Sequence, residues 1–312
     1  MAVVPLTRRV LALLLASTLS LSCSGEPADG GDSTAGAGTP AASGSADQAR
    51  PREQGREGGT LPETPSVEDL PALAAQLDVV SATLRDPGST RSLLREAGEL
   101  QQLAVRALNL ASARDRRRVL GMVRPATGTV LRANLSAAAP LRELTAAQRR
   151  LPRWRIVRPP APEVLLGFYR RAERRTDVPW EYLAAIHLTE TRMGRIRGTS
   201  TAGAQGPMQF IPTTWDIYGA GGDIDDPRDA ILAAGRLLRA NGAPRRMAQA
   251  LYRYNPSDSY VRAVSAYARS IRQVPWAYTG YWQWRVFYRH VRGTYVLPVG
   301  YPATRPTLLP GE

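Results

Sequence analysis

The feature that most constrains this chain is an amphipathic helix pattern over residues 178–194 whose apolar face carries an acidic residue. At about 100° per residue, Leu183, Ile186 and His187 lie on the same face as Glu190. A carboxyl group on a buried face is costly to ionise, so the pKa of Glu190 should rise until it holds a proton near neutral pH, as a general acid requires. His187, one turn earlier, could tune that pKa, although a single histidine on an apolar face is more often packed and hydrogen-bonded.

Helical periodicity extends over most of the chain and predicts a mainly α fold. In the first half, an apolar stripe at helical spacing follows Ser66, a candidate N-cap, and a second stripe begins after Ser89. No side chain there points to chemistry, so residues 66–150 could be an accessory module, an interaction segment or a brace. In the second half we expect helices at residues 163–175, 179–193, 212–217, 227–241, 245–253 and 258–272. Strand alternation is absent until residues 286–297, which could pair weakly.

A Pro-rich segment at residues 151–162 divides the chain into two helical parts. We therefore expect a helical accessory region at 65–150, a second domain at 151–300 and a tail at 301–312. The end of the chain is rich in aromatic side chains: Trp276, Tyr278, Tyr281, Trp282, Trp284, Phe287, Tyr288, Tyr295 and Tyr301. They could form a platform that extends a cleft, or pack over the back of the domain, which is the commoner use of aromatic residues.

The N-terminus has the pattern of an export signal. Arg8 and Arg9 precede a short apolar run that is too brief to span a membrane, so residues 1–22 are predicted to be a signal peptide. Cys23 follows at once and resembles the lipidated cysteine of bacterial lipoproteins; an incidental cysteine after a plain signal peptide is the alternative. Residues 23–64 are rich in Gly, Ser, Ala, Pro and Thr, which predicts a disordered tether.

Charge and cysteine content narrow the classes of partner. All 41 basic residues are Arg and the net charge is +14. Arg-only, Ala-rich usage is typical of a GC-rich bacterial genome, so charge alone does not favour nucleic acid; anionic envelope polymers or phospholipid head groups explain it equally well. Cys23 is the only cysteine, which excludes an intrachain disulfide and metal sites built on Cys. Residues 223–226 lack the alternation of a calcium loop and precede Pro227, which indicates a helix start; we expect no metal and no cofactor.

Two further motifs follow Glu190 along the chain. Residues 200–212 form a Gly-rich turn with the sequence Ser-Thr-Ala-Gly-Ala-Gln-Gly-Pro-Met-Gln-Phe-Ile-Pro, and Tyr254 and Asn255 form a pair further on. Gly203 and Gly206 suit either positive φ or close approach of the backbone to a ligand. Each motif is common when it occurs alone. Their order and spacing over 178–260 are far more specific.

This segment resembles the catalytic domain of bacterial lytic transglycosylases, the lysozyme-like enzymes that cleave peptidoglycan glycan strands. The pattern Gly-Ala-x-Gly-x-x-Gln-Phe-x-Pro, matched at residues 203–212, places it nearest the membrane-bound soluble-type B group. The resemblance does not cover residues 24–150. It implies a mainly α, lysozyme-like domain, preceded here by a small helical region and a disordered N-terminal tether. Together with the lipoprotein-like N-terminus, it predicts a lipid-anchored enzyme of the cell envelope, on the outer side of the cytoplasmic membrane or in the periplasm.

The resemblance implies that Glu190 is the sole catalytic acid and base. It would protonate the bond between N-acetylmuramic acid and N-acetylglucosamine, and then take a proton from the muramic C6 hydroxyl, which attacks the anomeric carbon to give a 1,6-anhydro product. Ordinary glycosidases use two carboxylates. Glu181 should lie on the opposite face of the helix, whereas sequence alone does not exclude Glu173 or Asp216 as a second carboxylate.

The other matched positions imply contacts with the sugar or with Glu190. The implied substrate-binding residues are Ser200, Met208, Gln209, Tyr254 and Asn255. The Ser200 hydroxyl would bind an acetamido group or bond the backbone, and Met208 and Gln209 would line the cleft, although Met208 could also fill core. The hydroxyl of Tyr254 would hold Glu190. Phe210 and Trp215 could stack on sugars or pack.

Three other functions compete with this hypothesis. A hydrolytic muramidase on the same fold would use water in place of the C6 hydroxyl and favour a second carboxylate near Glu190. A non-catalytic glycan-binding lipoprotein would keep the cleft but gain nothing from a buried acid. A nucleic-acid binder conflicts with the export signal.

Overall fold

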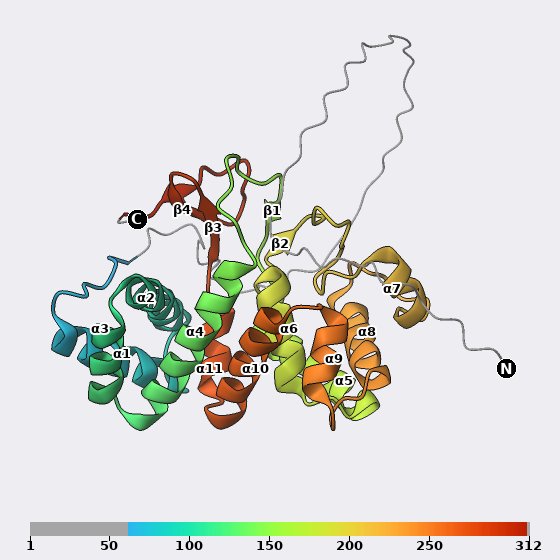
Figure 1. Cartoon of the computed structure of the whole chain (residues 1–312), viewed down its shortest axis with the longest axis horizontal. Coiled ribbons are helices and arrows are strands. Elements are labelled where there is room, and N and C mark those ends of the chain that lie inside the picture. The colour runs from blue at the N-terminus through green and yellow to red at the C-terminus, as the bar shows by residue number, and fades with distance from the viewer. Residues whose placement is uncertain (1–61, 311–312) are drawn as a thin grey trace, which may run out of the picture.

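The computed structural model of the chain describes residues 62–310. Over that range it contains eleven helices and five short strands, so the prediction of a mainly α chain is confirmed (Figure 1). The expected signal peptide at 1–22, Cys23 and nearly all of the expected tether at 23–64 lie outside the described residues. None of the helices within 62–310 is both long and apolar enough to cross a membrane.

Four helices make up the first part of the fold: α1 (Leu70–Arg85), α2 (Arg91–Leu110), α3 (Ala113–Met122) and α4 (Pro125–Glu143). The first three begin at side-chain caps, because an oxygen of Asp69, Thr90 or Ser112 accepts a backbone N–H that the helix leaves unpaired. The prediction that Ser66 caps the first helix is wrong. Asp69 holds that position, and Ser66 instead accepts a bond from the backbone N–H of Glu68.

Six helices of the second part lie where the sequence predicts them, with ends within two residues of the expected ones. They are α5 (Pro162–Thr176), α6 (Trp180–Thr191), α7 (Pro212–Tyr218), α8 (Pro227–Ala240), α9 (Met247–Tyr254) and α10 (Asp258–Gln273). A proline opens α5, α7 and α8, where its missing N–H costs nothing. Asp226 caps α8 by accepting from the backbone N–H groups of Arg228 and Asp229, which confirms that residues 223–226 start a helix.

The main hydrophobic cluster extends from the second part of the fold into α4 of the first part. α6 lies in its middle, α10 packs against α6, α9 and α4, and α5 packs against α8 (Figure 1). Val130 and Ala137 of α4 are buried in the same cluster as Leu183 and Ile186 of α6. α4 therefore shares a core with the segment that follows the Pro-rich stretch. α1 to α3 pack largely around a second cluster, which includes Leu77, Leu108 and Val119.

The aromatic end of the chain forms α11 (Trp276–Gln283) and then an antiparallel hairpin of β3 (Val286–His290) and β4 (Gly293–Leu297), joined by β5 (Thr307–Leu308). The hairpin confirms the pairing expected over 286–297, whereas α11 was not expected. Most of the aromatic rings pack inside: Tyr281 and Trp284 meet edge to face at 5.0 Å between ring centroids, and Tyr281 bonds Asn134 of α4.

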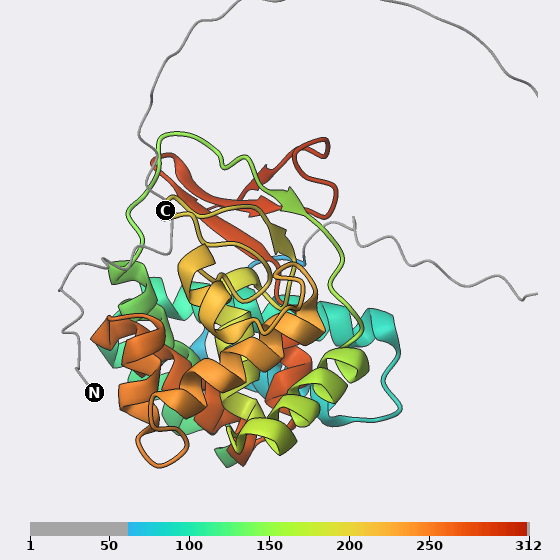
Figure 2. The ribbon, with the colours of Figure 1, turned by 90° about the vertical axis from the view of Figure 1, so that its right-hand side faces the viewer.

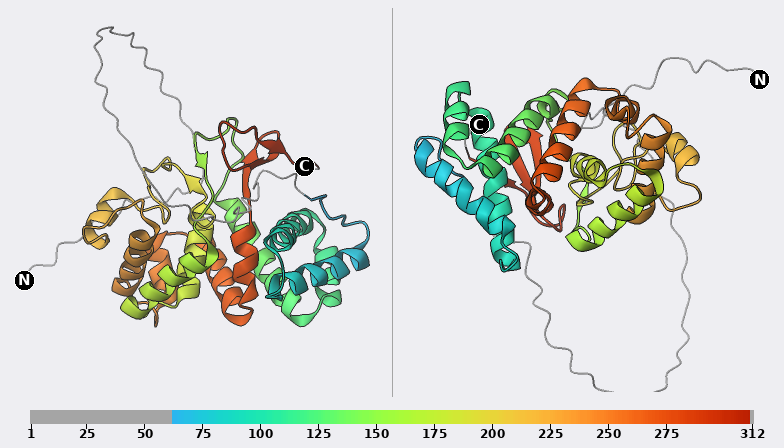
Figure 3. Two further views of the ribbon diagram at one scale, coloured as in Figure 1. Left: turned by 180° about the vertical axis from the view of Figure 1, so that it is seen from behind. Right: turned by 90° about the horizontal axis from the view of Figure 1, so that it is seen from below.

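The strands gather on one side of the helical layer (Figure 2). β1 (Arg155–Ile156) and β2 (Ile196–Arg197) pair antiparallel there. The middle of the Pro-rich stretch therefore lies beside the chain that leaves α6. α1 to α3 form one end of the molecule and α7 to α9 the other (Figure 3). Between them, α4, α6 and α10 and the strands above them frame the site described next.

Candidate functional site

Glu190 lies in the last turn of α6, on the face that the sequence predicts to be buried. Leu183, Ile186 and His187 on that face are fully buried, and Glu190 is 9% exposed. α6 ends just after it because Arg192 turns left-handed, with φ of 53°. The acid therefore sits where the helix stops and the chain turns towards β2.

Burial raises the pKa of Glu190 to about 8, and a hydrogen bond from Tyr260 lowers it by a smaller amount. The Tyr260 hydroxyl donates to Oε1 of Glu190 over 2.7 Å, so Oε2 is the oxygen left to carry the proton. Tyr254 stacks on Tyr260 with the two rings nearly parallel and their centroids 6.2 Å apart. The prediction that the pKa of Glu190 rises is confirmed.

Glu190 opens into a cavity of about 400 Å³ that is wide enough for a small ligand. Polar side chains of the lining come mainly from α6, the Gly-rich turn, the end of α9 and α10, and include Thr189, Glu190, Ser200, Gln209, Asn255 and Tyr260. Arg153, Thr199 and Thr201 complete the polar lining. Apolar side chains of the lining come from the end of α4, the segment before β1, and strands β2 and β3: Leu141, Leu144, Pro152, Trp154, Ile196 and Tyr288. Among the lining residues that the structure describes, Glu190 is the only carboxylate.

The carboxylates that the sequence left open lie elsewhere. Glu173 accepts bonds from the Arg170 guanidinium and from the backbone N–H of Trp180. Asp216 is exposed on α7 and does not line the cavity. The cavity thus offers one acid to a ligand, and that acid is largely protonated near neutral pH.

The Gly-rich turn is built against α6 and against the loop before α8. The Thr191 hydroxyl donates to the Pro207 carbonyl over 2.6 Å, which ties the turn to the end of α6. Gly203 and Gly206 both have positive φ, as expected. At Gly206 a Cβ would come within 1.9 Å of the Ile224 carbonyl oxygen, so the close approach there is to the protein backbone.

Three of the predicted binding residues reach the cavity, namely Ser200, Gln209 and Asn255. The Ser200 oxygen accepts a bond from the Ala204 backbone N–H, which leaves its hydroxyl proton to donate. The Gln209 amide nitrogen donates to the Gly206 carbonyl over 3.0 Å, so its Oε1 faces other partners. Both side chains are thus oriented by the turn rather than by Glu190.

Asn255 is the most conspicuous polar group of the lining. It is 4% exposed, and its Oδ1 has no hydrogen-bond partner within residues 62–310. A buried acceptor without a donor costs about 1–3 kcal/mol. A ligand N–H or O–H in the cavity would remove that cost.

The prediction that Met208 lines the cavity is wrong, because its side chain is fully buried in the main core. The prediction that the Tyr254 hydroxyl holds Glu190 is also wrong. That hydroxyl donates to the Met208 carbonyl over 2.6 Å and fixes the turn, and Tyr260 holds the acid instead. Phe210 and Trp215 pack on each other, with ring centroids 5.4 Å apart, and neither lines the cavity.

His187 is buried and hydrogen-bonded, as expected for a single histidine on an apolar helix face. Its Nδ1 lies 2.7 Å from the Tyr169 hydroxyl, and burial lowers the pKa of His187 to about 3, so it is neutral. It does not contribute to the pKa shift of Glu190. No group of His, Cys, Asp and Glu side chains within 62–310 is arranged to hold a metal ion.

The sequence reasoning missed Tyr260 and Trp154. Tyr260 lies in the first turn of α10, on the apolar stripe that continues through Ala263, Val264 and Tyr267. The sequence therefore predicts its burial but not its hydrogen-bond partner. Trp154 lies in the Pro-rich stretch, where no periodicity gives a direction. Its place at the cavity follows from the pairing of β1 with β2.

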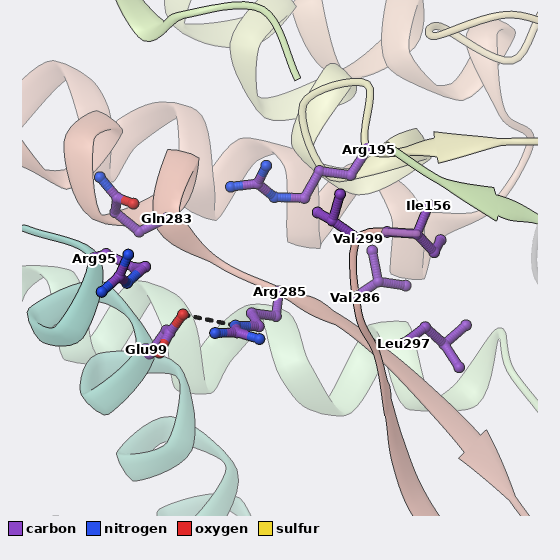
Figure 4. A pocket seen from close by; sticks show the side chains of 9 residues that line it. All are labelled: Arg95, Glu99, Ile156, Arg195, Gln283, Arg285, Val286, Leu297 and Val299. Atoms are coloured by element: carbon purple, nitrogen blue, oxygen red, sulfur yellow. Dashed lines mark hydrogen bonds and ion pairs between the residues drawn. The ribbon is translucent and has the colours of Figure 1, made fainter. Parts of the chain in front are cut away.

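A second, much smaller cavity of about 20 Å³ lies between α2, the loop after α6 and the start of β3 (Figure 4). Glu99 and Arg285 form a buried ion pair there at 2.6 Å. Burial raises the pKa of Glu99, and the Arg285 guanidinium lowers it by less. Arg195 extends towards the same space and donates to the carbonyls of Trp282 and Trp284 (Figure 4). These contacts join α2 to the second part of the fold.

Comparison of the chain with models of known protein families, with curated proteins and with solved structures found no match. What the site can do must therefore be judged from its own geometry and chemistry.

Proposed function

We propose that this protein is a peptidoglycan lytic transglycosylase and that Glu190 is its single acid and base. The observation that carries the proposal is a buried carboxyl, with its pKa raised to about 8, at the wall of a cavity whose described lining holds no second carboxylate. The order of the motifs over 178–260 supports the same function through the resemblance to that family. On this proposal, the helices from α5 to α10 form a lysozyme-like domain.

The proposed reaction needs one group that gives a proton and then takes one back. With a pKa of about 8, roughly nine-tenths of Glu190 is protonated at pH 7. Oε2 would donate its proton to the glycosidic oxygen as the bond to the muramic C1 breaks. The resulting carboxylate would then remove the proton from the C6 hydroxyl as O6 bonds to C1. No water is consumed, and Glu190 returns to its acid form.

The other lining groups have the chemistry that an N-acetylated sugar requires. The unpartnered Oδ1 of Asn255 suits an acetamido N–H, and the Ser200 hydroxyl and Gln209 Oε1 suit sugar hydroxyl or amide groups. Tyr260 would hold Glu190 through both steps, because its hydroxyl can stay bonded to Oε1 in either protonation state.

A hydrolytic muramidase is the nearest alternative. It would need a water held on the opposite side of the sugar by a second carboxylate, roughly 6.5–9.5 Å from the first in inverting enzymes. The described lining offers Glu190 alone, which favours the internal C6 hydroxyl as nucleophile. A glycan-binding lipoprotein without activity would have no reason to keep a carboxyl at the cost of burial.

The deciding experiment incubates the full chain, purified in detergent, with isolated peptidoglycan and reads the soluble products by mass spectrometry. We expect muropeptides with 1,6-anhydro ends, lighter by one water than reducing ends, and their loss in Glu190→Gln. Asp216→Asn is the matched control and should keep full activity, since Asp216 lies outside the cavity. Reducing ends would make the protein a muramidase. Intact glycan binding without products from the parent chain would leave a binding protein.

The cellular location is part of the same proposal. A signal at 1–22 would direct export, a lipid on Cys23 would hold the enzyme at the membrane, and a tether at 23–64 would let it reach the wall. Labelling of the chain with an alkyne fatty acid in a bacterial host, and loss of the label in Cys23→Ala, tests the anchor.

A further inference from the structure

The cavity has a second wall that the proposed reaction does not use. It is apolar, and it is made by Trp154, Tyr288 and the last turn of α4, which carries Leu141 and Leu144. This wall joins the end of α4 and the Pro-rich segment that follows it to β3, which is far from both in the sequence. α4 belongs to the helical region at 65–150, to which no role has so far been assigned.

Trp154 is held in this wall by contacts on two sides. Its ring meets Tyr288 edge to face, at 5.5 Å between centroids and an interplanar angle of 89°. On another side it rests on Gly198, where a Cβ would come within 2.6 Å of the indole Cδ1. Trp154 therefore presents a partly exposed aromatic side chain to the cavity.

The position of Trp154 relative to Glu190 is set by backbone pairing. Arg155, the next residue, pairs with Arg197 across β1 and β2, and β2 follows directly from the end of α6. The Tyr301 hydroxyl donates to the Pro152 carbonyl over 2.6 Å and holds the segment from its other side. The strand pairing and this hydrogen bond together restrict how far Trp154 can move relative to Glu190.

The end of α4 is tied to the same wall through β3. The Gln148 backbone N–H donates to the Arg289 carbonyl, and the Val291 N–H donates back to the Gln148 carbonyl. Arg289 also donates to the Thr145 carbonyl. Since Tyr288 precedes Arg289, Leu144 and Tyr288 are carried by segments that are bonded to each other.

An aromatic ring with a polar edge, beside aliphatic side chains, fits a pyranose. One face of such a sugar is made of C–H groups, and its hydroxyl groups project from the edge. A charged peptide would leave the wall poorly matched, because the cavity lining holds only Arg153 and the largely protonated Glu190 as ionisable partners. The chemistry of this wall therefore selects a sugar ring.

We propose that Trp154, Tyr288 and the end of α4 form a sugar-stacking subsite that continues the Glu190 cavity, so that the helical region at 65–150 is part of the substrate-binding site. This inference rests on the proposed function, since it assumes that the glycan that Glu190 cleaves extends along this wall. It assigns α4 a direct contact with substrate, in addition to its place in the core.

Binding of a β-1,4-linked N-acetylglucosamine tetramer to the full chain carrying Glu190→Gln tests the subsite. Calorimetry on this parent is compared with Trp154→Leu, which keeps apolar bulk but removes the ring, and with Trp154→Tyr, which restores a ring. We expect Leu to weaken binding about tenfold, which is about 1.4 kcal/mol, and Tyr to stay within about threefold of the parent. Trp276→Leu is the matched control, because Trp276 does not line the cavity, and should bind as the parent does.

A second pair of variants tests the part played by α4. Leu144→Asp places a charge on the wall, and Val79→Asp places the same charge on α1, where Val79 is 65% exposed and away from the cavity. We expect only the first to weaken tetramer binding. In the active chain, Trp154→Leu should raise KM and change kcat little, because stacking of this kind acts before the chemical step.

The outcomes separate this inference from the proposed function. Tetramer binding and turnover that survive Trp154→Leu and Leu144→Asp unchanged would overturn the subsite and leave the transglycosylase standing. Binding that depends on Trp154, in a chain that releases no products, would support the subsite and overturn the enzyme. A parent chain that neither binds the tetramer nor cleaves peptidoglycan would overturn both.

Discussion

Replacement of Glu190 by Gln should make the protein more stable, and increasingly so as the pH rises. The folded chain holds the pKa of Glu190 at about 8, whereas the ordinary value is 4.5. As the pH rises above 4.5, the unfolded chain therefore releases this proton before the folded chain does. Below about pH 4.5, the titration of Glu190 does not reduce the free energy of unfolding. Between about pH 4.5 and pH 8, it lowers that free energy by about 1.4 kcal/mol per pH unit.

The size of the effect follows from that interval. At pH 7 the buried acid costs about 3 kcal/mol relative to a neutral side chain, and above pH 8 the cost levels off at about 5 kcal/mol. Gln keeps the shape of Glu190 and can still accept the Tyr260 hydrogen bond through Oε1, so the variant removes the titration with little change in contacts. At about 2–4 °C per kcal/mol, the melting temperature at pH 7 should rise by roughly 6–12 °C.

Thermal unfolding of both chains between pH 4 and pH 9 is the assay. Glu68→Gln, at an exposed position ahead of α1, is the matched control and should leave the melting temperature unchanged throughout. The difference between Glu190→Gln and the parent should be close to zero at pH 4 and should widen up to about pH 8. A difference that does not vary with pH would show that Glu190 titrates at an ordinary pKa and would refute the reasoning from burial.

Two further predictions concern the partner of the acid and the turn beside it. Tyr260→Phe removes the hydrogen bond that lowers the pKa of Glu190; we expect the alkaline limb of the activity–pH profile to move upwards and kcat to fall about tenfold, and an unmoved limb would contradict that role. Gly206→Ala should cost about 3 kcal/mol of stability in chemical denaturation, because its Cβ would meet the Ile224 carbonyl oxygen. Gly203→Ala has the same positive φ but open space around it, so it should cost only about 1 kcal/mol, and equal losses would show that φ alone matters.

The helices around the site could be predicted because their signals are local. Apolar residues at helical spacing and a proline or Asp at the start define α5 to α10, and the shared face of Ile186 and Glu190 predicts the buried acid. α11 was not predicted because its aromatic residues are spread around the helix, so its sequence shows no helical spacing of apolar residues. A pattern of this kind gives a helix no preferred face.

The partners of the acid could not be predicted because they depend on how helices cross. Tyr254 ends α9 and Tyr260 lies in the first turn of α10, and the resemblance of the Tyr254–Asn255 pair favoured the wrong hydroxyl. Tyr260 is the one that bonds Glu190, because α10 packs along α6 and turns that residue inwards. Trp154 illustrates the same limit, since two-residue strands far apart in the chain bring it to the cavity.

The environment of Glu190 depends on α4, because α4 supports the helix that carries Tyr260. The raised pKa depends on burial, and the Tyr260 bond depends on the position of α10. α10 is held on its other side by α4, through the shared core and through the Ser259 hydroxyl, which donates to Glu143 over 2.6 Å. Because Ser259 and Tyr260 are neighbours, the residue that receives support from α4 and the residue that orients the acid move together. A change at the end of α4 therefore reaches Glu190 by a short covalent and hydrogen-bonded route, which makes the helical region at 65–150 a structural part of the acid's environment as well as a wall of the cavity.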